Sequence, residues 1–424
     1  MKKIIIAVVT IVLFCLWINS ALAADCSTLQ EWNSHKAYHN GDEVQYNADA
    51  YQANATTRGE QPDGGYPWLY LGSCDTGGGD GGGDDDLQPL SIYGVWHCGN
   101  HYCDWSEDNS NIASFDLENH WIIDRGDGTG LPSVNLVVLS FLEPLDLLNS
   151  SNYGTCEYGV PDPPIPDGVP VGMTKAVVDY FKSHGIRVML SMGGVTYTQS
   201  WNTALTTDPA RLACLAIKAV EALGANGLEI DWENGTPDAN ELEGIETFID
   251  TYNANSGSLL TLDLAVGDRY LQELSRRAAA DWLPNGKIDY INAMVPRGEP
   301  STDQWQEHVD GKLNYNPPIL PKAPAKVVVS LWLTDGRQPN DNCVDFASSS
   351  QLEKADYVQT VQPNGAGSTP GFLGYMFWAA GRPSTRNVST IPPDPTCEDG
   401  LGVGASPEHF DISPIDFGEV LSRY

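Results

Sequence analysis

The chain has 424 residues, of which 41% are hydrophobic and 19% are charged. It carries 56 acidic against 23 basic side chains, a net charge of −33 at pH 7. So acidic a surface repels nucleic acid and anionic membranes, and we expect neither as a partner. It suits a neutral or cationic substrate, a saline habitat, or simply high solubility.

Residues 1–23 have the pattern of a secretory signal peptide. Met1-Lys2-Lys3 precedes an apolar run from Ile4 to Ile18, and Ala21-Leu22-Ala23 forms a small-x-small cleavage site. The run is too short for a stable membrane anchor, and no later run is longer. We therefore expect a secreted, extracellular protein that begins near Ala24. Loss of the two signal lysines leaves 21 basic side chains, so its net charge is 21 − 56 = −35.

Eight cysteines remain after the signal, and an even number in a secreted chain indicates disulfides. The pairs that we expect are Cys26 with Cys74, Cys98 with Cys103, and Cys343 with Cys397. Cys156 and Cys214 are left unassigned. His97, Cys98, His101 and Cys103 have a spacing that metal sites also show, but a disulfide loop is favoured in a secreted chain. No metal site is predicted.

Residues 24–75 predict a small all-β domain. Short segments at 43–46 and 50–53 are separated by Asn-, Asp- and Gly-containing turns. A domain this small buries little core, so the Cys26–Cys74 bridge would be needed for stability. Residues 76–90 form a Gly- and Asp-rich linker, which predicts a flexible, self-repelling connection.

Residues 91–424 predict one large domain in which strands and helices alternate. The expected strands are 91–96, 134–142, 187–193, 227–233, 259–266, 288–295, 326–333 and 372–378, and the expected helices are near 173–183, 209–223, 240–252 and 269–280. Eight apolar strands, most of them separated by helices, indicate an α/β fold, a (β/α)8 TIM-type barrel with its active site at the C-terminal strand ends. A doubly wound open sheet is the alternative, but its Gly-rich phosphate fingerprint is missing.

The fourth barrel strand ends in three alternating acids, Glu229, Asp231 and Glu233. Alternation along a strand places all three on one face. Crowded like charges raise the pKa of at least one of them and make it a proton donor near neutral pH. A solvent-facing acidic edge is the simpler alternative, but Leu228 and Ile230 argue that the opposite face is buried.

Three motifs in residues 91–382 resemble glycoside hydrolase family 18, the chitinases and related endo-N-acetylglucosaminidases. Ser191-Met192-Gly193-Gly194 is similar to the family's Ser-x-Gly-Gly, and Asn226–Glu233 is similar to its Asp-x-x-Asp-x-Asp-x-Glu. Tyr375-Met376-Phe377-Trp378 is similar to the end of its eighth strand. Asn226 replaces the first Asp of the motif, at a largely structural position.

The resemblance implies a role for each of four residues. Glu233 would be the general acid and then the base. Asp231 would hold the substrate acetamide, whose oxygen attacks the anomeric carbon in place of an enzyme nucleophile. Glu229, in place of an Asp, would share charge or a proton with Asp231. Trp378 would lie under the sugar, with barrel core as the alternative. No cofactor is implied.

The sixth strand departs from the family. Met294-Val295-Pro296-Arg297 stands where Met-x-Tyr-Asp is common, so the tyrosine that donates to the acetamide carbonyl is missing. Tyr197, Asn292 and Arg297 are candidate replacements, of which we favour Tyr197. Met294 and Tyr197, with Ser191 and Gly193, complete the predicted substrate-binding set.

Residues 24–75 resemble the small chitin- and cellulose-binding modules of carbohydrate-binding families 5 and 12. Trp32, Trp68 and Tyr70 would stack on sugar rings, although each is equally able to form the core of so small a domain.

We therefore predict a secreted, monomeric, endo-acting chitinase that acts on chitin or another N-acetylglucosamine polymer. An endo-β-N-acetylglucosaminidase and a non-catalytic chitin-binding lectin are the alternatives. Tethering by the module favours an insoluble polymer.

Overall fold

The computed structural model describes residues 23–24, 29–46, 49–53, 55–58, 62, 68–74, 92–98, 105–265, 271–294, 301–332, 350–360 and 373–380. They belong to two compact units, Met1–Asp86 and Leu87–Tyr424. The predicted signal peptide, apart from Ala23, and the linker lie outside the described residues, as do Cys26, Cys103, Cys343 and Cys397.

The first unit is a small β-structure. Its five-stranded sheet has the order β1(Ala23–Ala24), β7(Trp68–Cys74), β5(Asp49–Ala53), β4(Glu43–Tyr46) and β2(Gln30–Glu31), and β3(Ala37–Tyr38) pairs with β6(Thr57–Arg58). The two strands expected from sequence lie in β4 and β5, which pair antiparallel with Val44 opposite Tyr51. Tyr38, Val44, Tyr51, Ala53 and Trp68 form its core.

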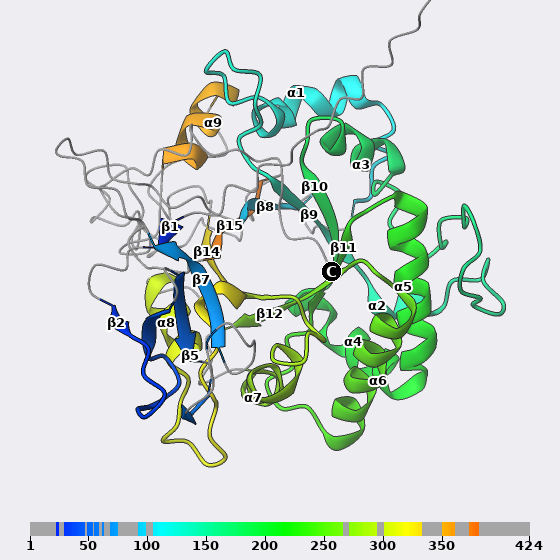
Figure 1. Ribbon diagram of the computed structural model, residues 1–424. Helices are drawn as coiled ribbons and strands as arrows, with labels where there is room; N and C mark the ends of the chain where they lie inside the picture. Colours follow the sequence, from blue (N-terminus) through cyan, green and yellow to red (C-terminus); the bar gives the residue numbers. More distant parts are fainter. Residues whose placement is uncertain are drawn as a thin grey trace, which may run out of the picture. The chain divides into compact units, whose positions relative to one another are not determined.

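The second unit contains a closed barrel of eight parallel strands, as predicted (Figure 1). In chain order these are β8(Ile92–Cys98), β9(Leu136–Leu142), β10(Arg187–Gly193), β11(Gly227–Asp231), β12(Leu259–Ala265), β13(Ile291–Met294), β14(Val327–Trp332) and β15(Gly374–Trp378). Alternate residues face inward, where they form a core that includes Ile92, Val138 and Met189, with Val328 and Met376 from the later strands. Their neighbours face the surrounding helices.

Nine helices of the described chain belong to this unit. They are α1(Ile112–Ile123), α2(Pro144–Leu148), α3(Lys175–Lys182), α4(Thr198–Thr207), α5(Pro209–Leu223), α6(Ala239–Asn255), α7(Gln272–Arg277), α8(Ser301–Asp310) and α9(Gln351–Thr360). A π-helical turn, Ala278–Trp282, continues α7. Helices α3, α5, α6 and α7 correspond to the four expected helices.

Local signals explain the bounds of α5. The Asp208 side chain accepts from Arg211 N at 3.0 Å, and Pro209 takes the first turn, where its missing N–H costs nothing. Gly224 ends the helix in the left-handed conformation, with φ of 73°. The sequence prediction of this helix was therefore correct to the residue.

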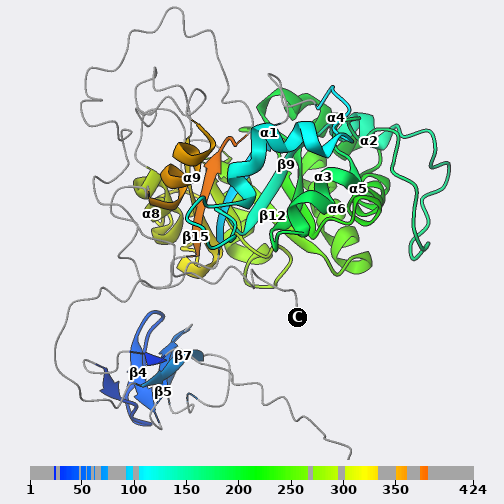
Figure 2. The ribbon, with the colours of Figure 1, turned by 90° about the horizontal axis from the view of Figure 1, so that it is seen from above.

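Helix α9 closes the outer layer beside α1, an arrangement visible in Figures 1 and 2. The Gln351 side chain accepts from Trp121 N at 3.0 Å and donates to Glu118 O at 3.2 Å. Neither helix was predicted, because their apolar residues do not follow a clear helical period.

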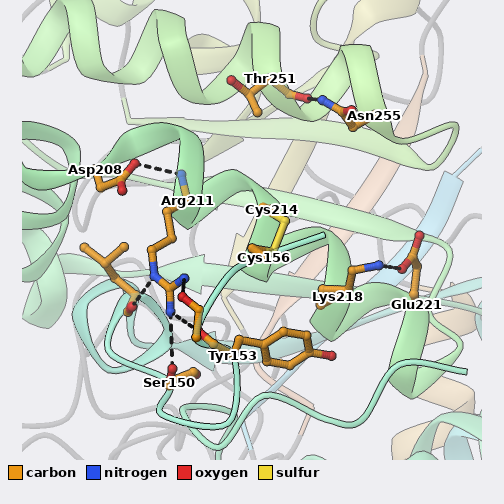
Figure 3. Close-up of a disulfide and its surroundings, with 12 residues drawn as sticks. Ser150, Tyr153, Cys156, Asp208, Arg211, Cys214, Lys218, Glu221, Thr251 and Asn255 are labelled. Carbon is orange, nitrogen blue, oxygen red and sulfur yellow. Dashed lines mark hydrogen bonds and ion pairs between the residues drawn. A yellow bond between two sulfur atoms is a disulfide. The ribbon is translucent and has the colours of Figure 1, made fainter. Parts of the chain in front are cut away.

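A disulfide ties the loop after α2 to α5 (Figure 3). Cys156 and Cys214, whose pairing the sequence left open, are joined with Cα atoms 6.2 Å apart. Beside them the Arg211 guanidinium donates to the carbonyls of Ser150 and Tyr153, at 3.3 and 2.5 Å. The helix therefore holds this loop by both covalent and polar contacts.

Among the described residues, none of the helices is both long and apolar enough to span a lipid bilayer.

Candidate active site

Three carboxyl groups point into the C-terminal half of the barrel. Glu229 and Asp231 alternate along β11, and Asp263 lies on the neighbouring strand β12. Their exposed fractions are 0%, 3% and 3%. The sequence predicted the first two; Asp263 was missed, although it alternates with inward-facing Leu259 and Thr261 in an otherwise apolar strand.

Glu229 accepts hydrogen bonds on both of its carboxyl oxygens. Trp96 Nε1 donates to Oε1 at 2.8 Å, and Asn292 Nδ2 donates to Oε2 at 2.6 Å. Burial nevertheless raises the pKa of Glu229 to about 7, against the opposing effect of these donors. Burial and the surrounding donors therefore act in opposite directions on the charge of Glu229.

Asp231 lies one step closer to the barrel mouth. Burial raises its pKa first, and the charges of Glu233 and Glu229 raise it further. The sequence named only the second cause, so the raised pKa was predicted but its main origin was not. Asp231 Oδ1 is buried and has no hydrogen-bond partner among the described residues. A buried oxygen of this kind is suited to an N–H donor from a bound ligand.

Strand β11 ends at Asp231, two residues earlier than predicted. Asp231 O accepts from Gly194 N at 2.8 Å, and Trp232 turns away to donate from Nε1 to Asn202 Oδ1 at 2.8 Å. Glu233 consequently lies in the loop just beyond the strand, half-buried. The charge of Glu233 raises the pKa of Asp231, which indicates that Glu233 lies close to the buried acids.

The segment after Glu233 is well anchored. Asn234 Nδ2 donates to Asn202 Oδ1 at 3.2 Å and to Glu241 Oε2 at 2.9 Å. Thr198 Oγ1 donates to the backbone carbonyl of Glu233 at 3.4 Å. These contacts fix the backbone of the proposed acid on a rigid part of the barrel.

The Ser-x-Gly-Gly segment supports the acids from β10. A Cβ atom on Gly193, which has φ of 124°, would lie 1.9 Å from Asp231 O, so only glycine fits this close approach. Ser191 faces Glu229 across the strand pair and is fully buried. Both predicted residues thus lie beneath the mouth of the site, where they shape β11.

Asn226 joins three neighbouring strands at the other end of β11. Its side chain accepts from Val188 N at 3.0 Å, and its backbone carbonyl accepts from Leu259 N at 3.1 Å. This agrees with the structural role expected for the position.

Trp378 ends the last strand and is half-buried. Phe141 stacks against it, with ring centroids 5.5 Å apart and planes 26° apart. The pair forms an apolar platform at the barrel end, and Phe141 was missed because it belongs to none of the sequence motifs.

A cavity of about 620 Å³ lies next to Phe141. It is lined by Phe141, Glu143, Asp146, Asn149, Ser151, Asp167, Gly168, Val169, Pro170 and Tyr197. Tyr197, at the end of a short 3-10 turn after β10, therefore shares a cavity with one half of the aromatic platform. The cavity gives a ligand room beside the barrel mouth.

The sixth barrel strand narrows the choice of acetamide donor. Asn292 directs its amide nitrogen to Glu229 and Asp263, so it is not free to bind substrate. This corrects its place among the candidates. Met294 ends the strand half-buried, while Pro296 and Arg297 lie outside the described residues. Tyr197 is the candidate that the described residues leave.

Three tryptophans near strand ends are buried and thus removed from sugar contact. Trp96, Trp105 and Trp201 donate from Nε1 to Glu229, Ser140 O and Met192 O, at 2.8, 2.5 and 3.1 Å. The side chain of Trp332 lies outside the described part.

In the first unit, Trp68 is 6% exposed and packs in the core against Tyr38. Trp32 is half-buried and meets Tyr46 edge-on, with ring centroids 5.3 Å apart. The side chain of Tyr70 is not among those described. Trp68 thus takes the core position that the sequence left open, and Trp32 keeps a partly accessible ring.

The cysteines and histidines whose spacing resembles that of a metal site begin with His97 and Cys98, the last two residues of β8. Cys98 is disulfide-bonded, and Cys103, its expected partner, lies outside the described residues. His97 is buried with its Nε2 2.7 Å from Asn119 Oδ1. Within the described ranges, no group of three or more His, Cys, Asp or Glu side chains is arranged to hold a metal ion.

No protein-family model matches the chain. Among solved structures it is similar to a family 18 chitinase from Pseudoalteromonas aurantia, with 14% identity over 68% of this chain and 93% of that chain, and a TM-score of 0.42. A chitinase from Aspergillus fumigatus has 17% identity over 68% and 90%, with a TM-score of 0.37. A chitinase-like agglutinin from Robinia pseudoacacia has 11% identity over 68% and 94%, with a TM-score of 0.38.

Proposed function

We propose that the protein is a secreted, endo-acting chitinase that hydrolyses β-1,4-linked N-acetylglucosamine polymers with retention of configuration. The observation that carries the proposal is a half-buried glutamate, Glu233, next to buried Asp231 and Glu229 at the C-terminal end of a closed barrel. Barrel enzymes place their chemistry at this end. The reaction needs no cofactor.

In the proposed mechanism Glu233 gives its proton to the glycosidic oxygen as the bond to the anomeric carbon breaks. The carbonyl oxygen of the substrate's own acetamide attacks that carbon and forms an oxazolinium ion. Asp231 accepts the acetamide N–H and stabilises the positive charge. Water then attacks the anomeric carbon and gives a proton to Glu233, which restores the enzyme.

The surroundings of Asp231 support this role. Its Oδ1 atom is buried and lacks a partner in the described part of the chain, so an acetamide N–H would satisfy it. The platform of Phe141 and Trp378 supplies aromatic faces suited to the apolar face of a pyranose ring.

Glu233→Gln tests the central role. The variant should fold normally and lose about a hundredfold or more in turnover on a defined chito-oligomer, because the amide cannot donate the required proton. Glu243→Gln, an exposed change on α6, is the matched control and should keep full turnover. Near-normal activity of Glu233→Gln would refute the assignment.

Wild-type protein that binds chitin without releasing soluble products would instead indicate a lectin. Cleavage of glycans but not of chito-oligomers would indicate an endo-β-N-acetylglucosaminidase.

Tyr197 is our candidate donor to the acetamide carbonyl. Its position on the cavity beside Phe141 supports this choice, as does the engagement of Asn292 with two carboxyl groups. Tyr197→Phe should lower kcat by about tenfold or more, since preorganised donors are worth a few kcal/mol. Unchanged kcat would exclude the hydroxyl from this role.

The N-terminal unit is proposed to bind the insoluble polymer through Trp32, a predicted stacking residue whose ring is partly accessible. Removal of residues 24–86 should lower activity on insoluble chitin much more than on soluble oligomers, because the module adds local concentration and no catalytic group. Equal loss on both substrates would contradict the binding role.

A further inference from the structure

Asp263 is a fourth acid of the site, and none of the three family-like motifs contains it. It lies on β12 opposite Asn292 of β13 and is almost fully buried. A buried carboxyl group is costly unless it is neutral, paired or hydrogen-bonded. Its contacts therefore indicate what state it occupies.

Asn292 connects Asp263 to Glu229. Its amide nitrogen lies 2.8 Å from Asp263 Oδ1 and 2.6 Å from Glu229 Oε2. An amide group has two N–H donors, so one serves each carboxyl group. Trp96 Nε1 occupies the other oxygen of Glu229. Glu229 is thus surrounded by donors, as an ionised carboxylate requires.

Asp263 and Glu229 lie so close together that the same Asn292 nitrogen is within hydrogen-bond distance of both. Two buried carboxyl groups at such short range do not both ionise, so one of them carries a proton. Since both Glu229 oxygens already accept N–H donors, the proton belongs on Asp263. The pair then has a single negative charge, located on Glu229.

We propose that Asp263 is a positioning residue that holds one proton against Glu229 and so keeps a single, fixed negative charge beneath Asp231. This inference rests on the proposed function, in which Asp231 stabilises the oxazolinium ion. A second negative charge at this depth would compete with Asp231 for the oxazolinium ion. A neutral Glu229 would weaken the stabilisation that Asp231 provides.

Among the described residues, the charge of Asp231 on β11 acts on Asp263, and Glu233, in the loop beyond β11, acts in turn on Asp231. Tyr290, which immediately precedes β13, is affected by the charges of both members of the pair. Trp96 from β8 and Ser191 from β10 are uncharged. Tyr290 is itself buried, and its pKa is raised by burial and by the charges of Glu229 and Asp263, so it stays neutral in the same range.

The first test follows thermal stability against pH and needs no substrate. A buried acid that keeps its proton gives the folded state more bound protons than the unfolded chain, whose Asp releases its proton near pH 4. That contribution is complete below about pH 4 and is lost as pH rises toward the raised folded pKa. The Tm of the wild type should therefore fall with rising pH.

Asp263→Asn removes the shared proton and should make this fall shallower between about pH 4 and 7. Glu229→Gln removes the other partner of the shared proton and should also make the fall of Tm with pH shallower. This variant tests the proposal if Asp263→Asn does not fold. Thr261→Val changes a buried inward-facing residue on the same strand and should keep the wild-type slope. Wild-type slopes in both amide variants, or an equal change in Thr261→Val, would overturn the proposal.

The second test is the pH profile of kcat/KM on a chito-oligomer. In the wild type, loss of the shared proton adds a negative charge near Glu233 and helps it keep its own proton. Asp263→Asn cannot release a proton and keeps the single charge on Glu229, so it should move the alkaline limb of the profile to lower pH by about half a unit. A uniform loss at every pH would indicate a packing role and contradict the proposal. Absence of hydrolysis in the wild type would refute the proposed function but leave the stability test valid.

Discussion

Two buried clusters of ionisable side chains differ in sign and in position. Glu229, Asp231 and Asp263 lie inside the barrel below its C-terminal mouth, while Lys322 and His308 are buried outside the barrel, around α7 and α8. Burial raises the pKa of all three acids, and it lowers the pKa of Lys322 to about 7. The same physical cause therefore drives both clusters toward neutrality.

The contacts of the two clusters show why only one is a candidate site. Lys322 Nζ donates to Ser275 Oγ at 2.9 Å, and its backbone N–H donates to Val309 O at 3.2 Å. Lys322 therefore connects α7 and α8 in the outer helical layer. The acids instead lie at strand ends, beside a half-buried glutamate. A perturbed pKa marks a functional site only together with such a position.

The largest effect on turnover in this comparison is expected at Asp231. Asp231→Asn should lower kcat by about a hundredfold to a thousandfold, because the charge that stabilises the oxazolinium ion is lost. Its Tm should not fall, since a buried charge is removed without a change of volume. The measurement is turnover on a chito-oligomer beside thermal unfolding. A fully active variant would place Asp231 with Lys322, outside the catalytic machinery.

Substitution in the cluster of Lys322 and His308 should change stability and leave turnover unaffected. Lys322→Met should raise the free energy of unfolding by up to about 4 kcal/mol at pH 6, because a buried ammonium group no longer has to be deprotonated or paired. The folded pKa lies below that of the unfolded chain, so the gain should shrink between about pH 7 and pH 10. Denaturant unfolding at several pH values measures it. Loss of kcat would break the distinction between the clusters.

A solvated charge cluster gives the smallest expected effect. Lys287 is 28% exposed and lies 3.0 Å from Asp250 and 3.1 Å from Asp281. Lys287→Ala should change the free energy of unfolding by less than about 1 kcal/mol, because water screens such pairs. The effect should decrease further in high salt. A loss of several kcal/mol would show that burial is not what separates these clusters.

Parts of this arrangement are visible in the sequence. Alternation alone places Glu229 and Asp231 on one face, and apolar strands between helices predict the closed barrel. Asp263 carries the same signal, since it alternates with Thr261, but one acid in an apolar run attracts no notice until its neighbours are known. The end of β11 at Asp231 was not predictable, because Asp231 contacts Gly194, which follows the neighbouring strand β10.

Other features depend on contacts between distant segments. Cys156 and Cys214 are 58 residues apart, and only the docking of the α2 loop on α5 brings them together. Phe141 meets Trp378 because β8, which pairs with both β9 and β15, brings the second and last strands of the barrel close. Neither pairing has a local sequence signature.

The anomeric form of the first product tests the proposed mechanism most directly. The substrate acetamide and then water each invert the anomeric carbon when they attack it, so net retention is expected. Proton NMR of fresh products from a defined chito-oligomer should show the β anomer first, with the α anomer appearing only later by mutarotation. Products that appear first as the α anomer would contradict the substrate-assisted mechanism and the roles given to Asp231 and Glu233.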